Sequence, residues 1–488
     1  MKILMIASEV APFAKTGGLG DVVGALSKEL AAAGHDVRVV CPLYGFLTPG
    51  PAWRAFPGVV SVHLGYGRED FCRVWQTPLP GAKAEVNFIE FSRYFARSGI
   101  YGDSGGGYTD NPERFVFLTR AALDWCIASE WIPDIVHAHD WPAALAPVYL
   151  NTVDRAGPLG RAASVFTIHN LEHQGYSPKW VLDFAGLPAW LFSADNLESF
   201  GQLNFMKGGL YHATKITTVS RHYAQEIQSP DGGCGLQDLL RFRAGDLIGV
   251  TNGIDTTEWN PSTDPHLPAR YSTGDLSGKT ACKTALQQRF GLQQHPTTPI
   301  FAAIARLYSQ KGLDLLAAII PELMKEMDAQ IVILGAGDAG LADNFRGLAR
   351  HYAGRVGAYI GFEESLAHLI EAGADFFVMP SRFEPCGLNQ MYSQAYGTPP
   401  IVRATGGLVD TVEPYQEGHG LGTGFLFHEP SARALHQAIE RAYDTYVDRP
   451  ADLLALRLNG MKRDFSWSNS TKQYVKIYEW ALALRRGA

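Results

Sequence analysis

Short apolar runs alternate with longer amphipathic stretches along the chain. Residues 2–8 are almost all apolar, as in a strand that is buried on both faces. Apolar side chains then recur at helical spacing between residues 22 and 30, Gly34 ends that helix, and residues 36–42 form a second apolar run. The chain therefore begins with a predicted strand–helix–strand unit of a parallel sheet.

The same pattern returns in the second half. A strand is predicted at 299–307, followed by a loop and a helix at 313–327. The remaining strand candidates are short apolar runs that end in polar residues or glycine: 134–141, 163–170 and 215–220 in the first half, and 330–337, 358–362, 375–381 and 399–407 in the second. Polar residues after the carboxyl ends of parallel strands are where doubly wound sheets bind ligands.

With 488 residues the chain is too long for one ordinary core, so two domains are expected. We predict two Rossmann-like α/β domains facing across a deep cleft, with residues 1–247 in the first and 248–465 in the second. The aromatic-rich stretch 466–488 is expected to be a helix that packs back on the first domain. A cleft between two domains is the expected ligand site.

Charge and composition exclude several classes of partner. The formal net charge is −7, which argues against nucleic acid or an anionic membrane as the main partner. No apolar run approaches the roughly 18–20 residues of a membrane-spanning helix. The six cysteines are far apart and form no C-x-x-C pair, which suits a reducing compartment. A cytoplasmic protein is therefore expected.

The loop "AKTGGLGD" (14–21) lies between the first strand and its helix. Glycines let the backbone approach an anion, the helix N-terminus offers free N–H groups, and Lys15 adds a positive charge. No G-K-[ST] follows at Walker spacing. Taken alone, the loop fits nucleotide hydrolysis, hydride transfer or sugar transfer, or simply a tight turn with a surface lysine.

"GAGDAG" (335–340) is a literal G-x-G-x-x-G between a strand and a helix. Glu363 and Glu364 follow about 20 residues later, as in an NAD fingerprint. Alone it would favour a nicotinamide-dependent dehydrogenase. It follows an interior strand of the second half and not the opening strand, which favours a structural turn, so NAD is not expected.

Three further loops of the second half carry candidate chemistry. Arg306 and Lys311 flank the loop after the first strand, where two cations suit a diphosphate, although solvated surface cations are the alternative. Glu384 lies between a very apolar strand and a helix. It could bind sugar hydroxyls or stabilise positive charge on a sugar ring, or merely cap the helix. Residues 405–407 form another strand-to-helix anion loop.

Histidines at the strand ends of the first half suggest a metal only weakly. His137, His139, Asp140 and His169 could share a site, but isolated histidines at strand ends are usually hydrogen-bonded. The chain also lacks an Asp-x-Asp sequence. No metal cofactor is expected.

Together these stretches resemble the bacterial glycogen synthase and plant starch synthase family, over nearly the whole chain and in order. The matching motifs are K-T-G-G-L-G-D-V (15–22), Y-G-D (101–103), H-A-H-D-W (137–141), H-N (169–170), N-G-I-D (252–255), R-L-x-x-Q-K-G (306–312), S-R-F-E-P-C-G-L (381–388) and T-G-G-L-x-D-T-V (405–412). The family's fold is the GT-B arrangement of two Rossmann-like domains.

The resemblance implies roles for the nucleotide-sugar site. Lys15, Gly17 and Gly18 would contact the donor's phosphates and sugar, while Arg306 and Lys311 would neutralise the leaving diphosphate. Phe362 would stack on adenine, and Glu384 would bind the glucose hydroxyls. The full set of further implied donor contacts is Asp21, Asn170, Asn252, Phe362, Glu384, Gly387, Thr405, Gly406 and Gly407.

The resemblance also implies an acceptor side and a catalytic set. His169 and Asn170 would lie beside the anomeric carbon, and Tyr101, Asp140 and Trp141 would line the sugar or acceptor site. The implied catalytic residues are Lys15, His169, Arg306, Lys311 and Glu384. Two positions depart from the family pattern: Pro142 stands where a second histidine is frequent, and Phe362 where a tyrosine is frequent.

The implied reaction is glucose transfer from ADP-glucose to the non-reducing 4-hydroxyl of an α-1,4-glucan, with retention of configuration. Glu384 is the one strong carboxylate candidate at the reacting sugar, whereas a retaining hydrolase uses two about 5 Å apart. We therefore expect front-face attack without a covalent intermediate. The alternatives are UDP-glucose as the preferred donor and a non-catalytic glucan-binding protein.

Overall fold

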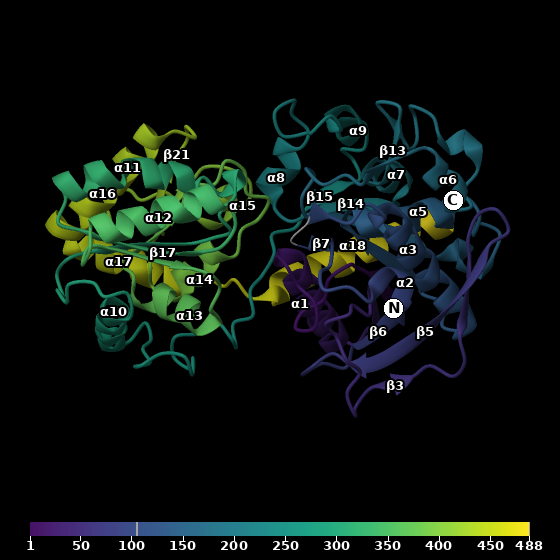
Figure 1. Ribbon diagram of the computed structural model, residues 1–488, viewed down its shortest axis with the longest axis horizontal. Helices are drawn as coiled ribbons and strands as arrows, with labels where there is room; N and C mark the ends of the chain where they lie inside the picture. Colours follow the sequence, from purple (N-terminus) through teal and green to yellow (C-terminus); the bar gives the residue numbers. More distant parts are fainter. Residues whose placement is uncertain (104–105, 488) are drawn as a thin grey trace. The chain divides into compact units, whose positions relative to one another are not determined.

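The computed structural model describes residues 1–103 and 106–487, and its chain forms two compact units (Figure 1). Unit 1 comprises Met1–Gly253 and Trp467–Ala488, and unit 2 comprises Ile254–Ser466. The chain passes from unit 1 to unit 2 after Gly253, a few residues beyond the predicted boundary between residues 247 and 248. The strand β15 (Leu247–Gly249) still pairs with the sheet of unit 1. Each unit has its own sheet and core.

The sheet of unit 1 contains ten strands, and its larger part is parallel. In spatial order the strands are β15, β14 (Lys215–Thr218), β10 (Ala163–Ile168), β9 (Ile135–His139), β1 (Lys2–Ile6), β2 (Asp36–Pro42), β6 (Glu85–Glu90), β5 (Glu69–Pro78) and β3 (Arg54–Ala55), with β4 (Val60–His63) also paired to β5. The predicted strands 2–8, 36–42, 134–141, 163–170 and 215–220 are confirmed. β6 and the antiparallel edge of β3, β4 and β5 were not predicted.

Unit 2 contains a six-stranded parallel sheet. Its spatial order is β18 (Val356–Ile360), β17 (Gln330–Gly335), β16 (Ile300–Ile304), β19 (Phe376–Met379), β20 (Pro400–Arg403) and β21 (Phe425–Phe427). Numbered along the chain, this is the 3-2-1-4-5-6 order of a doubly wound fold. The strand order reverses between β16 and β19, and in unit 1 between β1 and β9, so each sheet has a switch point where ligands are expected.

Helices cover both faces of each sheet. Those of unit 1 are α1 (Gly18–Ala32), α2 (Ser92–Phe95), α3 (Asn111–Ala128), α4 (Asp140–Ala143), α5 (Leu145–Asn151), α6 (Trp180–Phe184), α7 (Phe205–His212), α8 (Arg221–Glu226), α9 (Gln237–Phe242) and α18 (Trp467–Gly487). Those of unit 2 are α10 (Ser277–Arg289), α11 (Leu313–Glu326), α12 (Ala339–His351), α13 (Glu364–Gly373), α14 (Asn389–Ala395), α15 (Gly407–Thr411), α16 (Ala432–Asp448) and α17 (Pro450–Met461).

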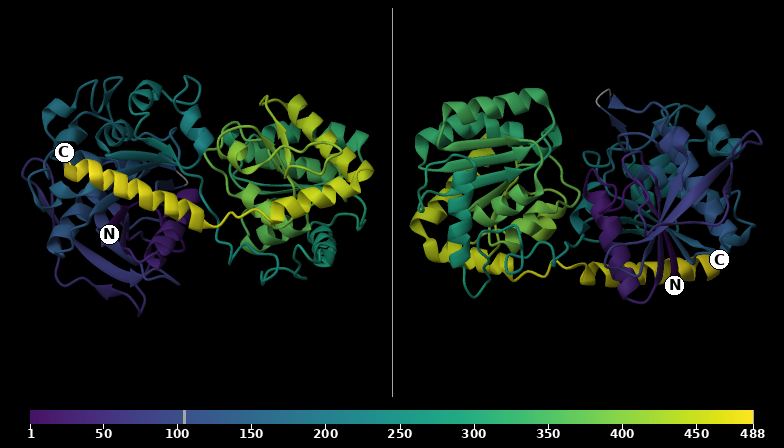
Figure 2. Two further views of the ribbon diagram at one scale, coloured as in Figure 1. Left: turned by 180° about the vertical axis from the view of Figure 1, so that it is seen from behind. Right: turned by 60° about the horizontal axis from the view of Figure 1, so that its bottom comes forward.

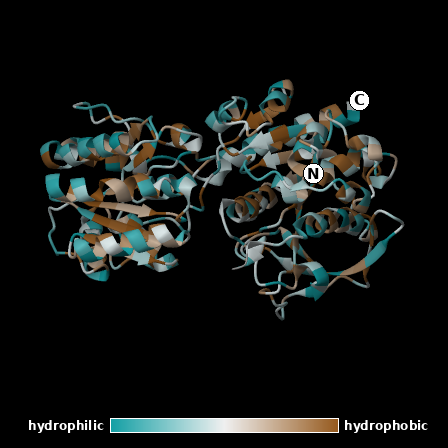
Figure 3. Cartoon of the chain, turned by 45° about the horizontal axis from the view of Figure 1, so that its top comes forward, coloured by the Kyte–Doolittle hydropathy of each residue, from teal (hydrophilic) through white to brown (hydrophobic). Residues whose placement is uncertain are grey.

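Hydrophobic residues, brown in Figure 3, concentrate in the strands, and the buried hydrophobic side chains form the core of each unit. The α18 helix, drawn in yellow in Figure 2, packs against α1 and β10 of unit 1. It buries Tyr474, Ile477 and Tyr478 there. Among the described residues, none of the helices has both the length and the apolar character that crossing a bilayer requires.

Candidate functional site

In each unit the chemically active side chains follow the strands at the switch point. In unit 1 the loops after β1, β9 and β10 carry Lys15, Asp140 and His169. In unit 2 the loops after β16 and β19 carry Lys311 and Glu384, and the loop after β20 carries residues 405–407.

Glu9 organises the glycine loop of unit 1, a role that the sequence analysis missed. Its carboxylate is buried and accepts the backbone N–H groups of Thr16 (2.6 Å) and Gly17 (3.3 Å). It also accepts the hydroxyl of Tyr101 at 2.7 Å, and the same Tyr101 oxygen lies 2.7 Å from Ser8 Oγ. Its position directly after an apolar strand and before a glycine loop is the only sequence signal for this role.

These bonds change the expected use of the loop. The amide of Gly17 is directed at Glu9, so this N–H does not point at a bound anion in this structure. The Tyr101 hydroxyl is likewise occupied in holding Glu9. Lys15 is half-exposed and forms an ion pair with Asp21 at 2.7 Å. Lys15 and Asp21 are thus brought together, while Gly18 opens helix α1.

A chain of buried rings connects the C-terminal helix to His169. Tyr478 on α18 lies 2.8 Å from His137 Nδ1, and Thr167 Oγ1 lies 2.6 Å from His137 Nε2. The His137 and His139 rings have centroids 4.1 Å apart, and His139 Nδ1 lies 3.0 Å from His169 Nε2. These bonds occupy both ring nitrogens of His137, but only one each of His139 and His169.

The ring chain favours one protonation state for His169. Burial lowers the pKa of His169 to about 3 and that of His137 to about 3, so both rings are neutral near pH 7. His139 Nε2 is buried and has no hydrogen-bond partner among the described residues. A bare nitrogen is less costly there than an unpaired N–H, so His139 carries its proton on Nδ1 and donates it to His169. His169 then carries its own proton on Nδ1, where it can donate to a ligand.

Asp140 supports the loop that carries His169. Its Oδ1 accepts the backbone N–H of His169 at 2.7 Å and that of Asn170 at 3.4 Å. Burial raises the pKa of Asp140 to about 7, although these two amides lower it; the charge of Glu9 raises it further. Its φ of 54° is left-handed, a conformation that aspartate and asparagine tolerate better than most residues. Asp140 therefore positions this loop from inside the protein.

Two other predicted residues of unit 1 are also packed into it. The Trp141 ring makes an edge contact with Phe115 at 4.9 Å between centroids, and a Cβ at Gly175 would lie 2.5 Å from that ring. Asn252 is buried, and its side-chain oxygen has no partner among the described residues. Such an orphaned acceptor is uncommon in a native fold and is a candidate for binding a ligand or water.

In unit 2 the central feature is the ion pair between Lys311 and Glu384. Lys311 Nζ lies 2.6 Å from Glu384 Oε2, and Ser381 Oγ donates to the same oxygen at 3.0 Å. The Glu384 side chain is buried. Its other oxygen, Oε1, makes no hydrogen bond within the described part of the chain. The second oxygen is therefore available to a sugar hydroxyl.

Close backbone contacts hold the three loops of unit 2 in place. Gly312 has a φ of 65°, and a Cβ there would lie 2.0 Å from the carbonyl oxygen of Pro380. Gly406 has a φ of 47°, and its Cβ would lie 1.9 Å from the carbonyl oxygen of Glu384. The backbone N–H of Gly407 donates to the same carbonyl oxygen of Glu384 at 3.1 Å, so this N–H is not free to donate to an anion. Gly387 (φ 74°) and the buried Thr405 flank these contacts.

Arg306 and Phe362 remain exposed near the ends of their strands. Arg306 forms no ion pair with the described residues and lies 5.8 Å from the Tyr308 ring centroid. A cation without a protein counter-ion suits an anionic ligand. Phe362 is 74% exposed directly after β18, which leaves its ring available for stacking.

The "GAGDAG" stretch serves as a structural turn in the described structure. Leu307 donates its N–H to the carbonyl of Ala336 and accepts the N–H of Asp338, both at 2.8 Å, so this loop is bonded to the loop after β16. The Asp338 carboxylate caps helix α12 by accepting the N–H of Leu341 at 2.8 Å. A carboxylate at this helix N-terminus occupies the position that a dinucleotide pyrophosphate would take.

Comparison with known proteins identifies the family. The starch synthase catalytic domain model matches residues 2–242, and the glycosyl transferases group 1 model matches residues 286–453. The chain is 47% identical to glycogen synthase 1 of Geobacter sulfurreducens over 489 residues, which covers 100% of this chain and 97% of that protein. It is 49% identical to a glycogen synthase of Anaeromyxobacter dehalogenans, with 98% of each covered.

A solved structure gives the same answer for the fold. The catalytic domain of starch synthase IV from Arabidopsis thaliana, bound to ADP and acarbose, is 34% identical, covers 99% of both chains and has a TM-score of 0.91. The expected two-domain GT-B architecture is thereby confirmed. The chain belongs to the starch synthase and bacterial glycogen synthase family, and it is a glycosyltransferase.

Proposed function

We propose that this enzyme transfers glucose from ADP-glucose to the non-reducing 4-hydroxyl of an α-1,4-glucan such as glycogen or a maltooligosaccharide, with retention of configuration. The observation that carries the proposal is the full-length similarity to glycogen synthases, together with a 34% identical starch synthase that was solved with ADP and acarbose bound. The local chemistry of both units is compatible with it.

In this proposal unit 2 binds the nucleotide sugar. Arg306 and Lys311 neutralise the diphosphate, Phe362 stacks on adenine, and Glu384 accepts glucose hydroxyls with Oε1. Lys311 Nζ lies 2.6 Å from Glu384 Oε2 and so pairs this buried carboxylate with a cation. When ADP leaves, the two cations stabilise the charge that develops on it.

Unit 1 supplies the acceptor side and further donor contacts. Lys15 contacts the donor phosphates once it separates from Asp21, and the Nδ1–H of His169 donates to a hydroxyl beside the anomeric carbon. A neutral His169 offers no negative charge to an oxocarbenium-like sugar and is a poor general acid, so we assign it to positioning. The acceptor 4-hydroxyl enters on the face from which ADP departs, and a departing phosphate oxygen takes its proton.

The proposed transfer itself uses neither a metal ion nor NAD. The alternative donor is UDP-glucose. NADH should show no saturable fluorescence change with this protein, because the Asp338 carboxylate caps α12. Saturable binding would reopen the dehydrogenase alternative for the "GAGDAG" loop.

The test compares glycogen-primed initial rates with ADP-glucose and UDP-glucose at equal concentrations. The proposal expects glucose incorporation from ADP-glucose to be the faster reaction, and ADP release to depend on added glucan. A faster reaction with UDP-glucose would select the alternative donor. No incorporation from either donor would refute the proposal.

A further inference from the structure

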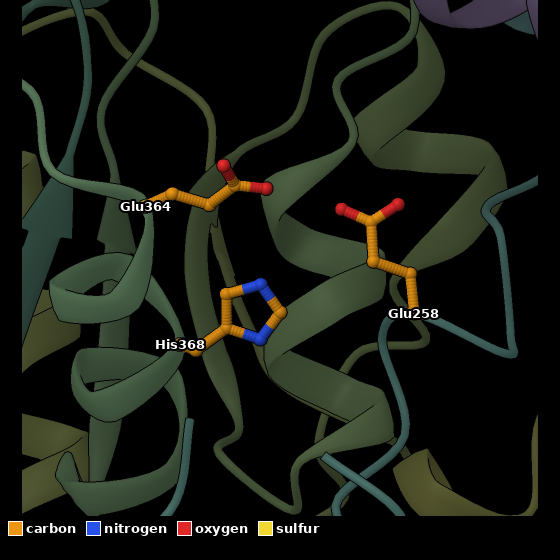
Figure 4. A group of neighbouring side chains, drawn as sticks. All are labelled: Glu258, Glu364 and His368. Carbon is orange, nitrogen blue, oxygen red and sulfur yellow. The ribbon is translucent and has the colours of Figure 1, made fainter. Parts of the chain in front are cut away.

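We propose that unit 2 carries a divalent-cation site, best suited to Zn²⁺, formed by Glu258, Glu364 and His368. It lies outside the residues assigned to glucose transfer and is a structural site in this proposal. Each of the three side chains offers one ligand atom, and these atoms all lie within 4.8 Å of one another. Figure 4 shows the two carboxylates approaching from opposite sides, with one ring nitrogen of His368 directed toward them.

The histidine is prepared for coordination by a buried acid. His368 Nδ1 lies 2.7 Å from Asp264 Oδ2, and both side chains are almost completely buried. The same Asp264 oxygen accepts the hydroxyl of Tyr396, and Asp264 Oδ1 accepts the amide of His266 at 2.8 Å. Because a carboxylate oxygen accepts, the ring donates from Nδ1, and Nε2 is left to offer its lone pair to an ion.

That lone pair has no other use within the described residues. His368 is 1% exposed, and its Nε2 is buried without a hydrogen-bond partner. The ring cannot easily turn away, because it stacks on Trp259 with centroids 3.9 Å apart and an interplanar angle of 9°. A carboxylate–histidine pair with a fixed, unpartnered nitrogen is the arrangement that holds and orients metal-ligating histidines.

The ligand set favours zinc over harder cations. Imidazole suits Zn²⁺ and neighbouring transition metals, whereas Mg²⁺ and Ca²⁺ prefer oxygen alone. Zinc bonds of about 2.0–2.2 Å require ligand atoms roughly 3.3 Å apart in a tetrahedral site. Glu258 and Glu364 are both exposed, so small rotations of their side chains can close the remaining distance, and water can supply a fourth ligand.

The sequence contains part of this signal. Glu364 and His368 are four residues apart on α13 and therefore share one helix face, as metal-binding pairs often do. Glu258 comes from the segment that opens unit 2, over a hundred residues earlier in the chain, and only the fold brings it to α13. A bound ion would thus fasten the opening segment of unit 2 to this helix.

A second group in unit 2 has the same composition but weaker support. In Glu322, Glu326 and His436, the Nε2 of the histidine already lies 3.1 Å from Glu326 Oε2. Among the described residues, no buried acid orients that ring. This second group serves as an internal comparison for the experiment.

The test uses the full-length protein after removal of metals with a chelator. Zn²⁺ is titrated against a competing chromophoric chelator, and Co²⁺ is added separately to record its visible absorption. The variants are Glu364→Gln and the matched control Glu363→Gln, whose carboxylate pairs with Arg289 at 2.9 Å and is not in the cluster. Both are surface changes, so both variants are expected to fold.

The proposal expects one Zn²⁺ per chain and a Co²⁺ spectrum typical of low-coordinate nitrogen and oxygen ligands, in the parent protein and in Glu363→Gln alike. Glu364→Gln should weaken Zn²⁺ binding at least about tenfold and reduce the rise in melting temperature on adding Zn²⁺. Absence of saturable binding, or equal affinity in both variants, would overturn it. The proposal would also be overturned if Glu322→Gln lost Zn²⁺ binding while Glu364→Gln kept it.

Discussion

Lys311 bears the largest expected catalytic effect of any single residue in unit 2. It compensates Glu384 in the structure and is proposed to stabilise the departing ADP. Replacement by alanine should lower kcat by about 10²–10³, the range found for other donors that stabilise a developing anion. The exposed Lys325, near the end of the following helix α11, provides the control, and Lys325→Ala should keep normal rates. A near-normal kcat for Lys311→Ala would contradict the assignment.

Replacing Glu9 is predicted to lower activity, although its side chain contacts no atom that takes part in the proposed reaction. Glu9→Ala removes the acceptor of two backbone amides and of the Tyr101 hydroxyl, and each buried unsatisfied group costs about 1–3 kcal/mol. We expect kcat/KM for the donor to fall at least about tenfold. Glu9→Gln should fall less, because its oxygen still accepts the amides. Glu29→Ala on helix α1 is the control; a loss as large as in Glu9→Ala would argue against a specific role for Glu9.

Asp140 gives a pH dependence of stability with a defined sign. Its pKa is raised to about 7 in the fold, against about 3.9 in an unfolded chain. Between these values the folded state holds a proton that the unfolded state has lost, so this stabilising contribution is full below about pH 4 and disappears as the pH rises through 7. Asp140→Asn lacks this dependence but keeps an oxygen acceptor and tolerates the left-handed φ.

The melting temperature of the parent minus that of Asp140→Asn should therefore decrease between pH 5 and pH 8. The comparison cancels the titration of His137, His139 and His169, which both proteins share. A difference that stays constant or grows over this range would show that Asp140 is not buried as described.

At the level of elements, the loops of unit 2 depend on glycines that no other residue can replace. In Gly406→Ala the new Cβ would meet the Glu384 carbonyl oxygen and the backbone would be strained at φ 47°. We expect Glu384 to be displaced and kcat to fall more steeply than thermal stability. Gly347→Ala on α12 has open space around its Cβ and should be neutral or stabilising by up to about 1 kcal/mol. Equal activity of the two variants would contradict the tight loop packing.

Sequence patterns were sufficient for the parallel strands and their carboxyl-end loops. These strands are continuous apolar runs because helices cover them on both faces, and such runs are visible without the fold. β5 was missed because its buried and exposed positions partly alternate, and β6 because Glu85, Asn87 and Glu90 interrupt its apolar run. The glycine motifs indicated the sites of close approach, but which amides stay free required the fold.

The same limit applies to the site residues. Lys15, Asp21, Lys311 and Glu384 were predicted as separate contacts, and the structure pairs Lys15 with Asp21 and Lys311 with Glu384. Glu9 and Tyr101 lie 92 residues apart, and His368 and Asp264 lie 104 apart, so no local motif marks either contact. Buried polar groups of this kind are defined by tertiary contacts alone.

For the whole molecule, the proposed function requires glucose transfer with retention of the anomeric configuration. Proton NMR of a single reaction containing ADP-glucose and a maltooligosaccharide follows donor loss, linkage growth and free glucose at the same time. Retaining transfer predicts a growing α-1,4 anomeric signal that matches the loss of ADP-glucose, with little free glucose. A β-anomeric product, or donor consumption that yields free glucose without chain growth, would contradict it.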